Sequence, residues 1–412
     1  MSPKRAAEGA RVRPRGSSQG GLKQYNERVV LHAIRLAGSA ASAEIARSTG
    51  LTAQTVSMIT KRLLEEGYLL KGTPQRGRVG QPSVPLSLDP EGAHAVGIKL
   101  GRRRLDMVLV DFTGRVRSRW SIDYSFPDPD DVLAGIARGF AAIRRRLGPA
   151  GRERVQGIGL AAPLALGGWR SLLGVDPALA QRWADIDLRE RVAALCDWPV
   201  ESMKDTSAAC VAELVAGRGR DVHSFLYLFI DTFIGGGLVI DSHLRNGESG
   251  NAGAVGSMPL GLAPGRPGTP AAQLLSVASL HALEQAWARA GLAVPAAGWA
   301  DALVGVHRSV TLEWIAQSAV AIAHAIASAA CLLDLAAVIV DGAIDRPLLQ
   351  TLLDAVRDAL ERYDWEGVRM PQVLQGMVGS DAGALGGALL PLHANFAPDR
   401  DLFLKAMTEG SP

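Results

Sequence analysis

The chain has few cysteines, and none of them is arranged as a pair. Cys196, Cys210 and Cys331 are the only three among 412 residues, and they lie far apart with no CxxC pattern. This spacing argues against a disulfide framework and favours reduced, structural thiols. We therefore expect a cytoplasmic protein.

The sequence also lacks clear membrane-directing segments. Its first residues carry charges but no apolar core of a signal peptide. The most apolar stretch, residues 318–340, is rich in alanine and contains His324 and Asp334. These features favour a buried helix running into a strand over a membrane span, so we expect no membrane partner.

Acidic residues are scarce at the N-terminal end. Residues 1–90 hold 14 Lys and Arg against 6 Asp and Glu, whereas the rest of the chain holds 30 against 35. This balance fits local contact with a polyanion, although a basic tail without a partner explains the charge equally well. Length and composition predict a disordered basic tail over residues 1–21, a small domain over 22–90 and a larger one over 91–405.

Residues 42–67 have the pattern of two short helices joined by a turn at Gly50. Ser42 and Thr52 are suitable N-caps, and Gly67 is a suitable helix end. A helix over residues 24–36 should precede this pair. Two strands, residues 68–71 and 83–88, should follow it and flank a basic loop. The whole is typical of a winged helix-turn-helix (α+β) DNA-binding domain.

The second helix of the pair should read DNA. Its N-terminal end carries small polar side chains that can reach base edges in the major groove, and Gln54 could bind adenine with two hydrogen bonds. Basic residues farther along the helix and in the wing should contact phosphates or the minor groove. The predicted DNA-binding residues are Thr52, Gln54, Thr55, Ser57, Lys61, Arg62, Arg76 and Arg78. The alternative is a small helical domain that binds protein.

The larger domain shows one pattern twice: a hairpin, a strand, and then helix–strand units. Expected strands are residues 95–100, 104–111, 116–122, 155–160, 225–230, 235–241 and 337–341, with a short one near Gln372. Expected helices are residues 131–147, 311–333 and 347–362. This order predicts a duplicated α/β fold with two lobes and a cleft between them.

With these segments in view, the chain resembles the ROK family (repressor, open reading frame, kinase) over residues 21–392. Residues 26–35, 46–57 and 80–82 are similar to the family's first helix, helix-turn-helix and wing end. Residues 235–241 and 250–259 are similar to the middle of its kinase-like domain. The resemblance implies a winged helix-turn-helix followed by a sugar-kinase-like domain of the actin-like ATPase fold.

The chain departs from the family's kinases at the phosphate loop. Those kinases have Asp-x-Gly-Gly-Thr, where glycine backbone approaches ATP. Here Lys99, Arg102 and Arg103 replace the acid, one glycine and the threonine. The bulk of the arginines should fill the phosphate space, so we expect no ATP and no catalytic residue. The segment 260–275 also lacks the family's zinc-binding cysteines and histidine, so we expect no metal.

The family's sugar-binding positions are only partly kept. Its Asn-Asp pair is Lys204-Asp205 here, and its Gly-Glu-x-Gly-His becomes Gly253-Ala-Val-Gly-Ser257. Asp205 could accept hydrogen bonds from hydroxyl groups, or it could form a salt bridge with Lys204 or a neighbour. Ser257 could bind a ligand or be a simple turn residue. The predicted ligand-binding residues are Lys204, Asp205, Gly235, Gly236, Asn251 and Ser257.

These observations predict a transcriptional regulator, a repressor, controlled by a sugar or sugar derivative. Its partners would be a double-stranded DNA operator and a small carbohydrate-related effector. The family and the half-site geometry of helix-turn-helix proteins imply a homodimer or homotetramer. Two alternatives stay open: a sugar kinase with an accessory DNA-binding domain, and a constitutive DNA-binding protein whose larger domain only oligomerises.

Overall fold

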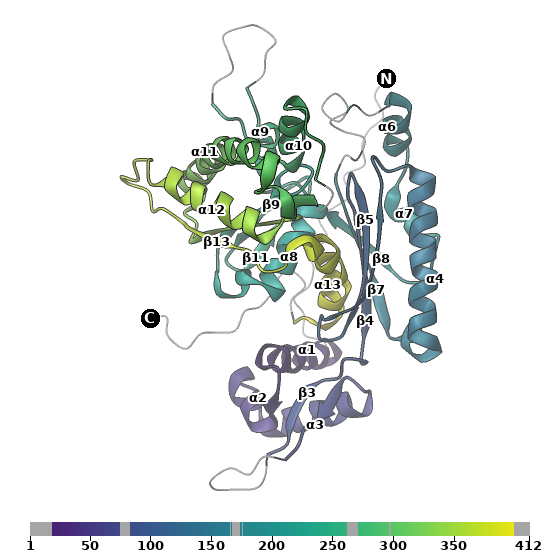
Figure 1. Cartoon of the computed structure of the whole chain (residues 1–412). Helices are drawn as coiled ribbons and strands as arrows, with labels where there is room; N and C mark the ends of the chain where they lie inside the picture. Colours follow the sequence, from purple (N-terminus) through teal and green to yellow (C-terminus); the bar gives the residue numbers. More distant parts are fainter. Residues whose placement is uncertain are drawn as a thin grey trace, which may run out of the picture.

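The computed structural model describes residues 19–74, 83–164, 166, 174, 176–261, 271–295 and 298–398. A small N-terminal domain of helices and a three-stranded sheet lies at one end of the molecule (Figure 1). Its elements are α1 (Gln19–Ala37), β1 (Ala40–Ala41), α2 (Ser42–Thr49), α3 (Ala53–Glu65), β2 (Leu69–Lys71) and β3 (Pro85–Leu88). The sheet order is β1-β3-β2, so β3 pairs on both sides. The order of helix, turn, helix and hairpin agrees with the sequence pattern.

The turn between α2 and α3 follows from local chemistry. Gly50 has φ 67°, a left-handed conformation that glycine adopts without strain. Thr52 caps α3, because its side-chain oxygen accepts a hydrogen bond from the Thr55 backbone N–H at 3.2 Å. The prediction that Ser42 caps α2 is wrong. Ala41 occupies the cap position, and its backbone N–H donates to the Glu44 carboxylate at 2.8 Å.

The predicted disordered tail is too long at its C-terminal end. Residues 19–21 are the first residues of α1, which packs its buried side chains Val30, Leu31 and Ile34 into the domain core. Tertiary packing of this apolar stripe stabilises the helix, which then extends towards its N-terminus. Residues 1–18 of the expected tail lie outside the described residues.

Two five-stranded sheets form the body of the molecule (Figure 1). The first sheet has the order β6-β5-β4-β7-β8 and the second has β11-β10-β9-β12-β13. The first contains β4 (His94–Leu100), β5 (Arg104–Asp111), β6 (Val116–Asp123), β7 (Val155–Ala162) and β8 (Val200–Lys204). The second contains β9 (Phe225–Ile230), β10 (Gly235–Ile240), β11 (His243–Arg245), β12 (Ala337–Gly342) and β13 (Gln372–Gln375).

The two sheets share one topology. In each, the first strand (β4 or β9) pairs antiparallel with the next strand and parallel with a strand that follows a helical segment. At one edge of each sheet the outermost pair, β5–β6 or β10–β11, is antiparallel. At the other edge the outermost pair, β7–β8 or β12–β13, is parallel. The duplicated α/β architecture with two lobes is therefore confirmed.

Helices cover both faces of each sheet. The first sheet packs against α4 on one face and α13 on the other. The second sheet packs against α8 on one face and against α11 and α12 on the other (Figure 1). The helices are α4 (Pro129–Glu153), α6 (Pro177–Ala184), α7 (Leu188–Ala193), α8 (Asp205–Ala216), α9 (Leu274–Val277), α10 (Leu280–Arg289), α11 (Arg308–Leu333), α12 (Arg346–Leu360) and α13 (Ala382–Phe396). Short 3₁₀ turns are η1 (Arg218–Asp221), η2 (Val255–Ser257), η3 (Gly298–Asp301), η4 (Gly305–His307) and η5 (Gly379–Asp381).

Helices α8 and α13 pack against each other in the middle of the molecule, and glycine allows α13 to approach its neighbours closely. A Cβ added to Gly386 of α13 would lie 1.7 Å from the carbonyl oxygen of Ala208 in α8. A Cβ added to Gly97 of β4 would lie 1.8 Å from the carbonyl oxygen of Ala384. Backbone therefore packs on backbone at the centre of the molecule.

One helix among the described residues, over Gly305–Leu333, is long and apolar enough to cross a membrane by length and composition, with a mean hydropathy of 1.7. Its Trp314, Ile315, Ile322 and Ile326 side chains are buried in the core of the second lobe. It contacts α9, α10 and α12 along its length. This packing is that of a core helix, as the sequence predicts for residues 318–340.

Candidate functional site

The cleft between the lobes lies where several strands end. β8 ends at Lys204 and α8 begins at Asp205, while β9 of the other lobe ends just before Asp231. Lys99, near the end of β4, reaches Asp231 across this gap, with 2.5 Å between Nζ and Oδ2. Side chains from both lobes therefore meet at one place.

The cleft contains a cavity of about 230 Å³ that brings together most of the predicted ligand-binding residues. Five of the six line it: Lys204, Asp205, Gly235, Asn251 and Ser257. Gly236 lies behind the wall, where its carbonyl oxygen accepts a hydrogen bond from Thr206 Oγ1 at 2.9 Å. A Cβ at Gly236 would lie 2.3 Å from the Tyr227 carbonyl oxygen, so this glycine lets the β9–β10 hairpin close.

Asp205 keeps most of its hydrogen-bonding capacity. Within the described part of the chain, its carboxylate accepts one hydrogen bond, from the Thr206 backbone N–H at 2.8 Å. Lys204 points elsewhere and donates to the Gly236 carbonyl oxygen at 3.5 Å, so the alternative of a Lys204–Asp205 salt bridge is not what the structure shows. Burial raises the pKa of Asp205, and the charges of Lys99 and Arg102 offset part of this effect.

Asn251 and Ser257 are exposed and line the same cavity. Neither side chain has a hydrogen-bond partner among the residues that the structure describes. Ser257 ends the short turn η2, so its placement at a turn is confirmed and its hydroxyl still faces the cavity. The cavity lining therefore includes an amide, a hydroxyl and a carboxylate, a suitable set for a polyhydroxyl ligand.

The residues at the phosphate-loop position hold the two lobes together. Besides the Lys99–Asp231 pair, Arg103 Nη1 lies 2.6 Å from Glu284 Oε1 in α10, and the Arg102 guanidinium lies 4.9 Å from the centre of the Phe233 ring. Sequence reasoning identified the basic residues but missed all three partners. These partners come from the other lobe, more than a hundred residues away, and no local pattern marks them.

Three cavities lie beside these contacts. They measure about 20 Å³ between Lys99, Asp205 and Asp231, about 70 Å³ beside Arg104 and Asp381, and about 220 Å³ beside Phe126 and Leu179. The first has room for roughly one water molecule. Burial raises the pKa of Asp231, but the Lys99 and Arg102 charges outweigh it and lower the net value. The ion pair is therefore charged at neutral pH. Among the described residues, no group of three or more His, Cys, Asp or Glu could hold a metal ion.

On the N-terminal domain, α3 presents the predicted base-reading residues. Gln54 and Ser57 are exposed, and the Thr52 and Thr55 hydroxyls share a hydrogen bond of 2.8 Å. Lys61 is 79% exposed and lies 4.0 Å from Glu65. Met58, on the same helix, is 63% exposed.

Arg62 differs from Lys61. Its guanidinium pairs with Glu27 of α1 and lies 3.1 Å from Glu66, so two carboxylates already neutralise it. Arg62 is therefore less available for a phosphate than predicted, and it ties α3 to α1. The predicted wing residues Arg76 and Arg78 lie outside the described residues.

Comparison with known proteins identifies the body of the chain. A sequence model of the ROK family matches residues 95–394, which contain both sheets and the cleft. The chain belongs to the ROK family. The resemblance read from residues 235–241 and 250–259 is thereby confirmed.

Similar proteins include a sugar repressor and an uncharacterised protein. The xylose repressor of Bacillus subtilis is 25% identical over 244 residues, 58% of this chain and 61% of that protein, so the match spans about three fifths of that relative. The uncharacterised protein y4fQ of Sinorhizobium fredii is 26% identical and covers 90% of this chain and 91% of its own length.

Two solved structures share the fold. A ROK family transcriptional regulator, described as a homologue of the Escherichia coli MLC protein, aligns with a TM-score of 0.66 at 21% identity over 91% of this chain and 98% of its own. A ROK family glucokinase from Streptomyces griseus, in complex with glucose and AMPPNP, aligns with a TM-score of 0.55 at 22% identity, over 72% of this chain and 99% of its own. At these identities the likeness concerns the fold alone, so function must be argued from this chain's residues.

Proposed function

We propose that this ROK protein is a cytoplasmic transcriptional repressor whose DNA affinity depends on a sugar or sugar derivative bound between its lobes. The observation that carries the proposal is the cleft itself. Asp205 faces a cavity with spare acceptor capacity, while the neighbouring phosphate position is occupied by interlobe contacts. The site is therefore built to bind hydroxyl groups and not to bring a nucleotide to them.

The N-terminal domain supplies the output of this proposal as a winged helix-turn-helix. Helix α3 exposes small polar side chains at its N-terminal end and Lys61 farther along, the arrangement that a recognition helix needs in the major groove. The names of relatives such as the xylose repressor of Bacillus subtilis and the N-acetylglucosamine repressor of Escherichia coli O157:H7 support this reading. A homodimer, or a homotetramer, would place two α3 helices on two half-sites.

Ligand binding would act by favouring one closure of the lobes and so changing the placement of the two DNA-reading helices. The direct test is an operator shift assay with DNA upstream of the gene and random DNA at moderate salt. Sequence-preferring binding that responds to a sugar supports the proposal. Equal binding to both DNAs would refute the repressor proposal. Phosphorylation of a sugar by ATP that depends on Asp205 would show that the protein is a sugar kinase.

Substituting Asp205 with asparagine should weaken sugar binding by roughly ten- to a hundredfold, because hydrogen bonds to a charged acceptor contribute about 1.5–3 kcal/mol.

Sugar binding to the unmodified chain should also weaken as the pH falls through the raised pKa of Asp205, since the protonated acid accepts fewer hydrogen bonds. Isothermal titration with xylose, glucose and N-acetylglucosamine measures both effects. Asp358→Asn, on the exposed side of α12, is the matched control. Equal affinities for Asp205→Asn and the unmodified chain would remove Asp205 from the site.

Substitutions of Gln54 and Lys61 should reduce DNA binding in different ways. Gln54→Ala removes a base contact and should cost about 1–3 kcal/mol on the operator with little effect on random DNA. Lys61→Ala removes a phosphate contact, so it should weaken binding to all DNA and reduce the salt slope by about 1. Fluorescence anisotropy against salt concentration separates the two. If both variants lose the same affinity on random DNA, Gln54 does not read bases.

A further inference from the structure

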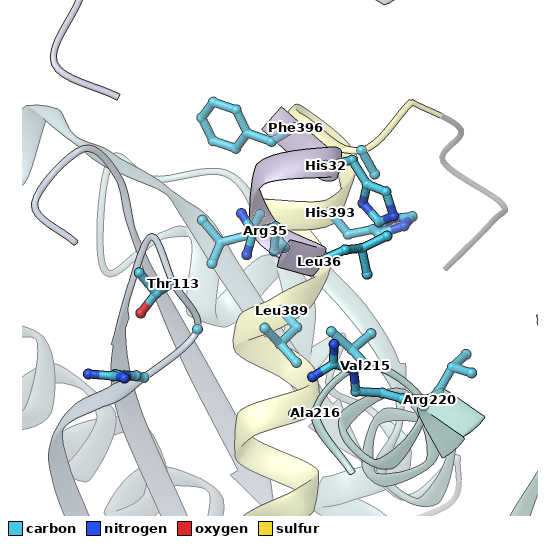
Figure 2. A pocket seen from close by; sticks show the side chains of 15 residues that line it. His32, Arg35, Leu36, Thr113, Val215, Ala216, Arg220, Leu389, His393 and Phe396 are labelled. Atoms are coloured by element: carbon cyan, nitrogen blue, oxygen red, sulfur yellow. The ribbon is translucent and has the colours of Figure 1, made fainter. Parts of the chain in front are cut away.

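A second cavity lies far from the sugar cleft, at the junction of the N-terminal domain and the body. It measures about 310 Å³, a volume at the lower end of small-molecule sites. Figure 2 shows its walls: α1 of the N-terminal domain on one side, and α13, the end of α8 and the β5–β6 turn of the body on the others. We call it the junction pocket.

The junction pocket combines positive charge with an apolar wall. Its charged and titratable lining residues are Arg35, Arg115, Arg220, His32 and His393, and its lining contains no Asp or Glu. Its apolar lining residues are Leu36, Leu214, Val215, Ala216, Leu389, Leu392, Phe396 and Ala397. A surface of this kind suits an anion that carries an apolar body.

Arg35 is the central cation of the pocket. Its guanidinium lies 5.2 Å from the centre of the Phe112 ring, and no oxygen among the described residues accepts a hydrogen bond from it. Burial lowers the pKa of Arg35 to about 10, partly offset by the charge of Asp111. A guanidinium without an acceptor is a binding group for a carboxylate or phosphate oxygen.

Asp111, whose charge raises the pKa of Arg35, already accepts hydrogen bonds from other groups. One of its oxygens accepts hydrogen bonds from the Thr113 backbone N–H at 2.9 Å, from the Thr113 hydroxyl at 2.6 Å and from the Arg115 backbone N–H at 3.1 Å. The other oxygen lies 3.4 Å from Arg117. Asp111 therefore holds the β5–β6 turn in shape and leaves the guanidinium groups of Arg35 and Arg115 for a ligand.

Arg220 adds a third cation from the body. Its side chain is exposed, and no carboxylate or carbonyl oxygen in the described ranges accepts a hydrogen bond from it. Figure 2 shows it beside Val215 and Ala216 at the end of α8, on the side of the pocket away from Thr113. The cations therefore surround the apolar wall and are not gathered at one edge.

From this geometry we propose that the junction pocket binds a small amphipathic carboxylate, a second effector besides the sugar. Its carboxylate would pair with Arg220, and its apolar body would lie on Leu389, Phe396 and the end of α8, towards Arg35. Such a molecule contacts α1 and the body together. It therefore holds the DNA-reading domain at one angle to the body.

Octanoate is a suitable probe, tested by isothermal titration on the full chain without DNA or sugar. We expect one octanoate per chain, and at least tenfold weaker binding of 1-octanol, which lacks the charge, and of inorganic phosphate, which lacks the apolar body. Octanol binding as tightly as octanoate would overturn the role of the arginines. Phosphate binding as tightly would overturn the role of the apolar wall. Because the assay needs neither operator nor sugar, its result is independent of the proposed repressor function.

Two variants from different walls locate the site. Arg220→Gln should weaken octanoate binding at least tenfold, whereas Arg145→Gln, an exposed arginine on α4 outside the pocket, should not change it. Ala216→Trp should fill the pocket and abolish octanoate binding while sugar binding in the cleft persists. Octanoate binding that survives Ala216→Trp, or that Arg145→Gln weakens as much as Arg220→Gln does, would place the probe elsewhere and refute the proposal.

Discussion

Replacing Lys99 with methionine is expected to lower the free energy of unfolding by about 3 kcal/mol, the lower end of the cost of leaving one member of a buried ion pair alone. The Lys99 side chain is 7% exposed and that of Asp231 is 28% exposed, so the remaining carboxylate would be only partly solvated. Asp205 faces the same space, and in the variant the two acids would share Arg102 as their nearest cation. Repulsion between them would add to the loss.

The effect should depend on pH in a defined direction. The folded chain lowers the pKa of Asp231, so this group stabilises the fold above its unfolded pKa of about 4 and loses that contribution as pH falls through the folded value. The difference between the unmodified chain and Lys99→Met should therefore be full at neutral pH and shrink as Asp231 becomes protonated in acid. Denaturant unfolding at several pH values measures it.

Two further variants control this experiment. Lys71→Met, at an exposed position of β2, should change stability by less than about 0.5 kcal/mol. Adding Asp231→Leu to Lys99→Met should recover most of the loss, because an apolar pair of similar size avoids the unpaired charge. A double variant as unstable as Lys99→Met alone would show that the loss comes from packing and not from charge.

Replacing Gly386 with alanine is expected to cost at least about 3 kcal/mol, the upper part of the usual range for overpacking a core. The new Cβ would lie 1.7 Å from the Ala208 carbonyl oxygen, and the atom that must move is backbone of α8, not the end of a flexible side chain. Moving α8 also moves Asp205 at its first turn. If the cleft binds a sugar as proposed, the variant should lose sugar affinity together with stability.

Gly367→Ala is the matched control for this substitution. Its Cβ would meet open space, although its φ of 79° costs an L-residue about 1–2 kcal/mol. Thermal unfolding with and without sugar compares the two variants. If Gly386→Ala is no less stable than Gly367→Ala, the α8–α13 contact is looser than the structure shows.

Where residues interact with near neighbours, the sequence predicted the structure well. The Thr52 cap, the Gly50 turn and the strands of both sheets depend on local chemistry and on runs of apolar residues. The cap of α2 was misplaced because Glu44, reaching back to Ala41, competes with the serine at residue 42. The Ser42 hydroxyl and the Glu44 carboxylate both lie in the first turn, and the sequence pattern alone could not show which of them would cap the helix.

Other features could not be predicted because they depend on distant parts of the chain. Helix α13 contains Gly383, Gly386 and Gly387, which disfavour an isolated helix, and it forms because those glycines pack on the first sheet and on α8. The pairing of Arg103 with Glu284 likewise joins two lobes that no local pattern relates. Five of the six residues predicted to bind a ligand line the cleft cavity, because they occupy the family's motif positions; their role in binding stays a prediction.

The N-terminal domain and the body share one continuous apolar core. Tyr68, Phe112 and Phe396 contact one another with ring centroids 4.6–5.7 Å apart, and Arg154 crosses from the body to the Glu66 carbonyl oxygen at 3.0 Å. Because the two domains share this core, the N-terminal domain cannot be replaced independently of the body. A DNA-reading domain taken from a relative would fit this body only if its own side chains packed on Phe112 and Phe396. Changes in operator preference should therefore arise on the outer face of α3 and not through replacement of the whole domain.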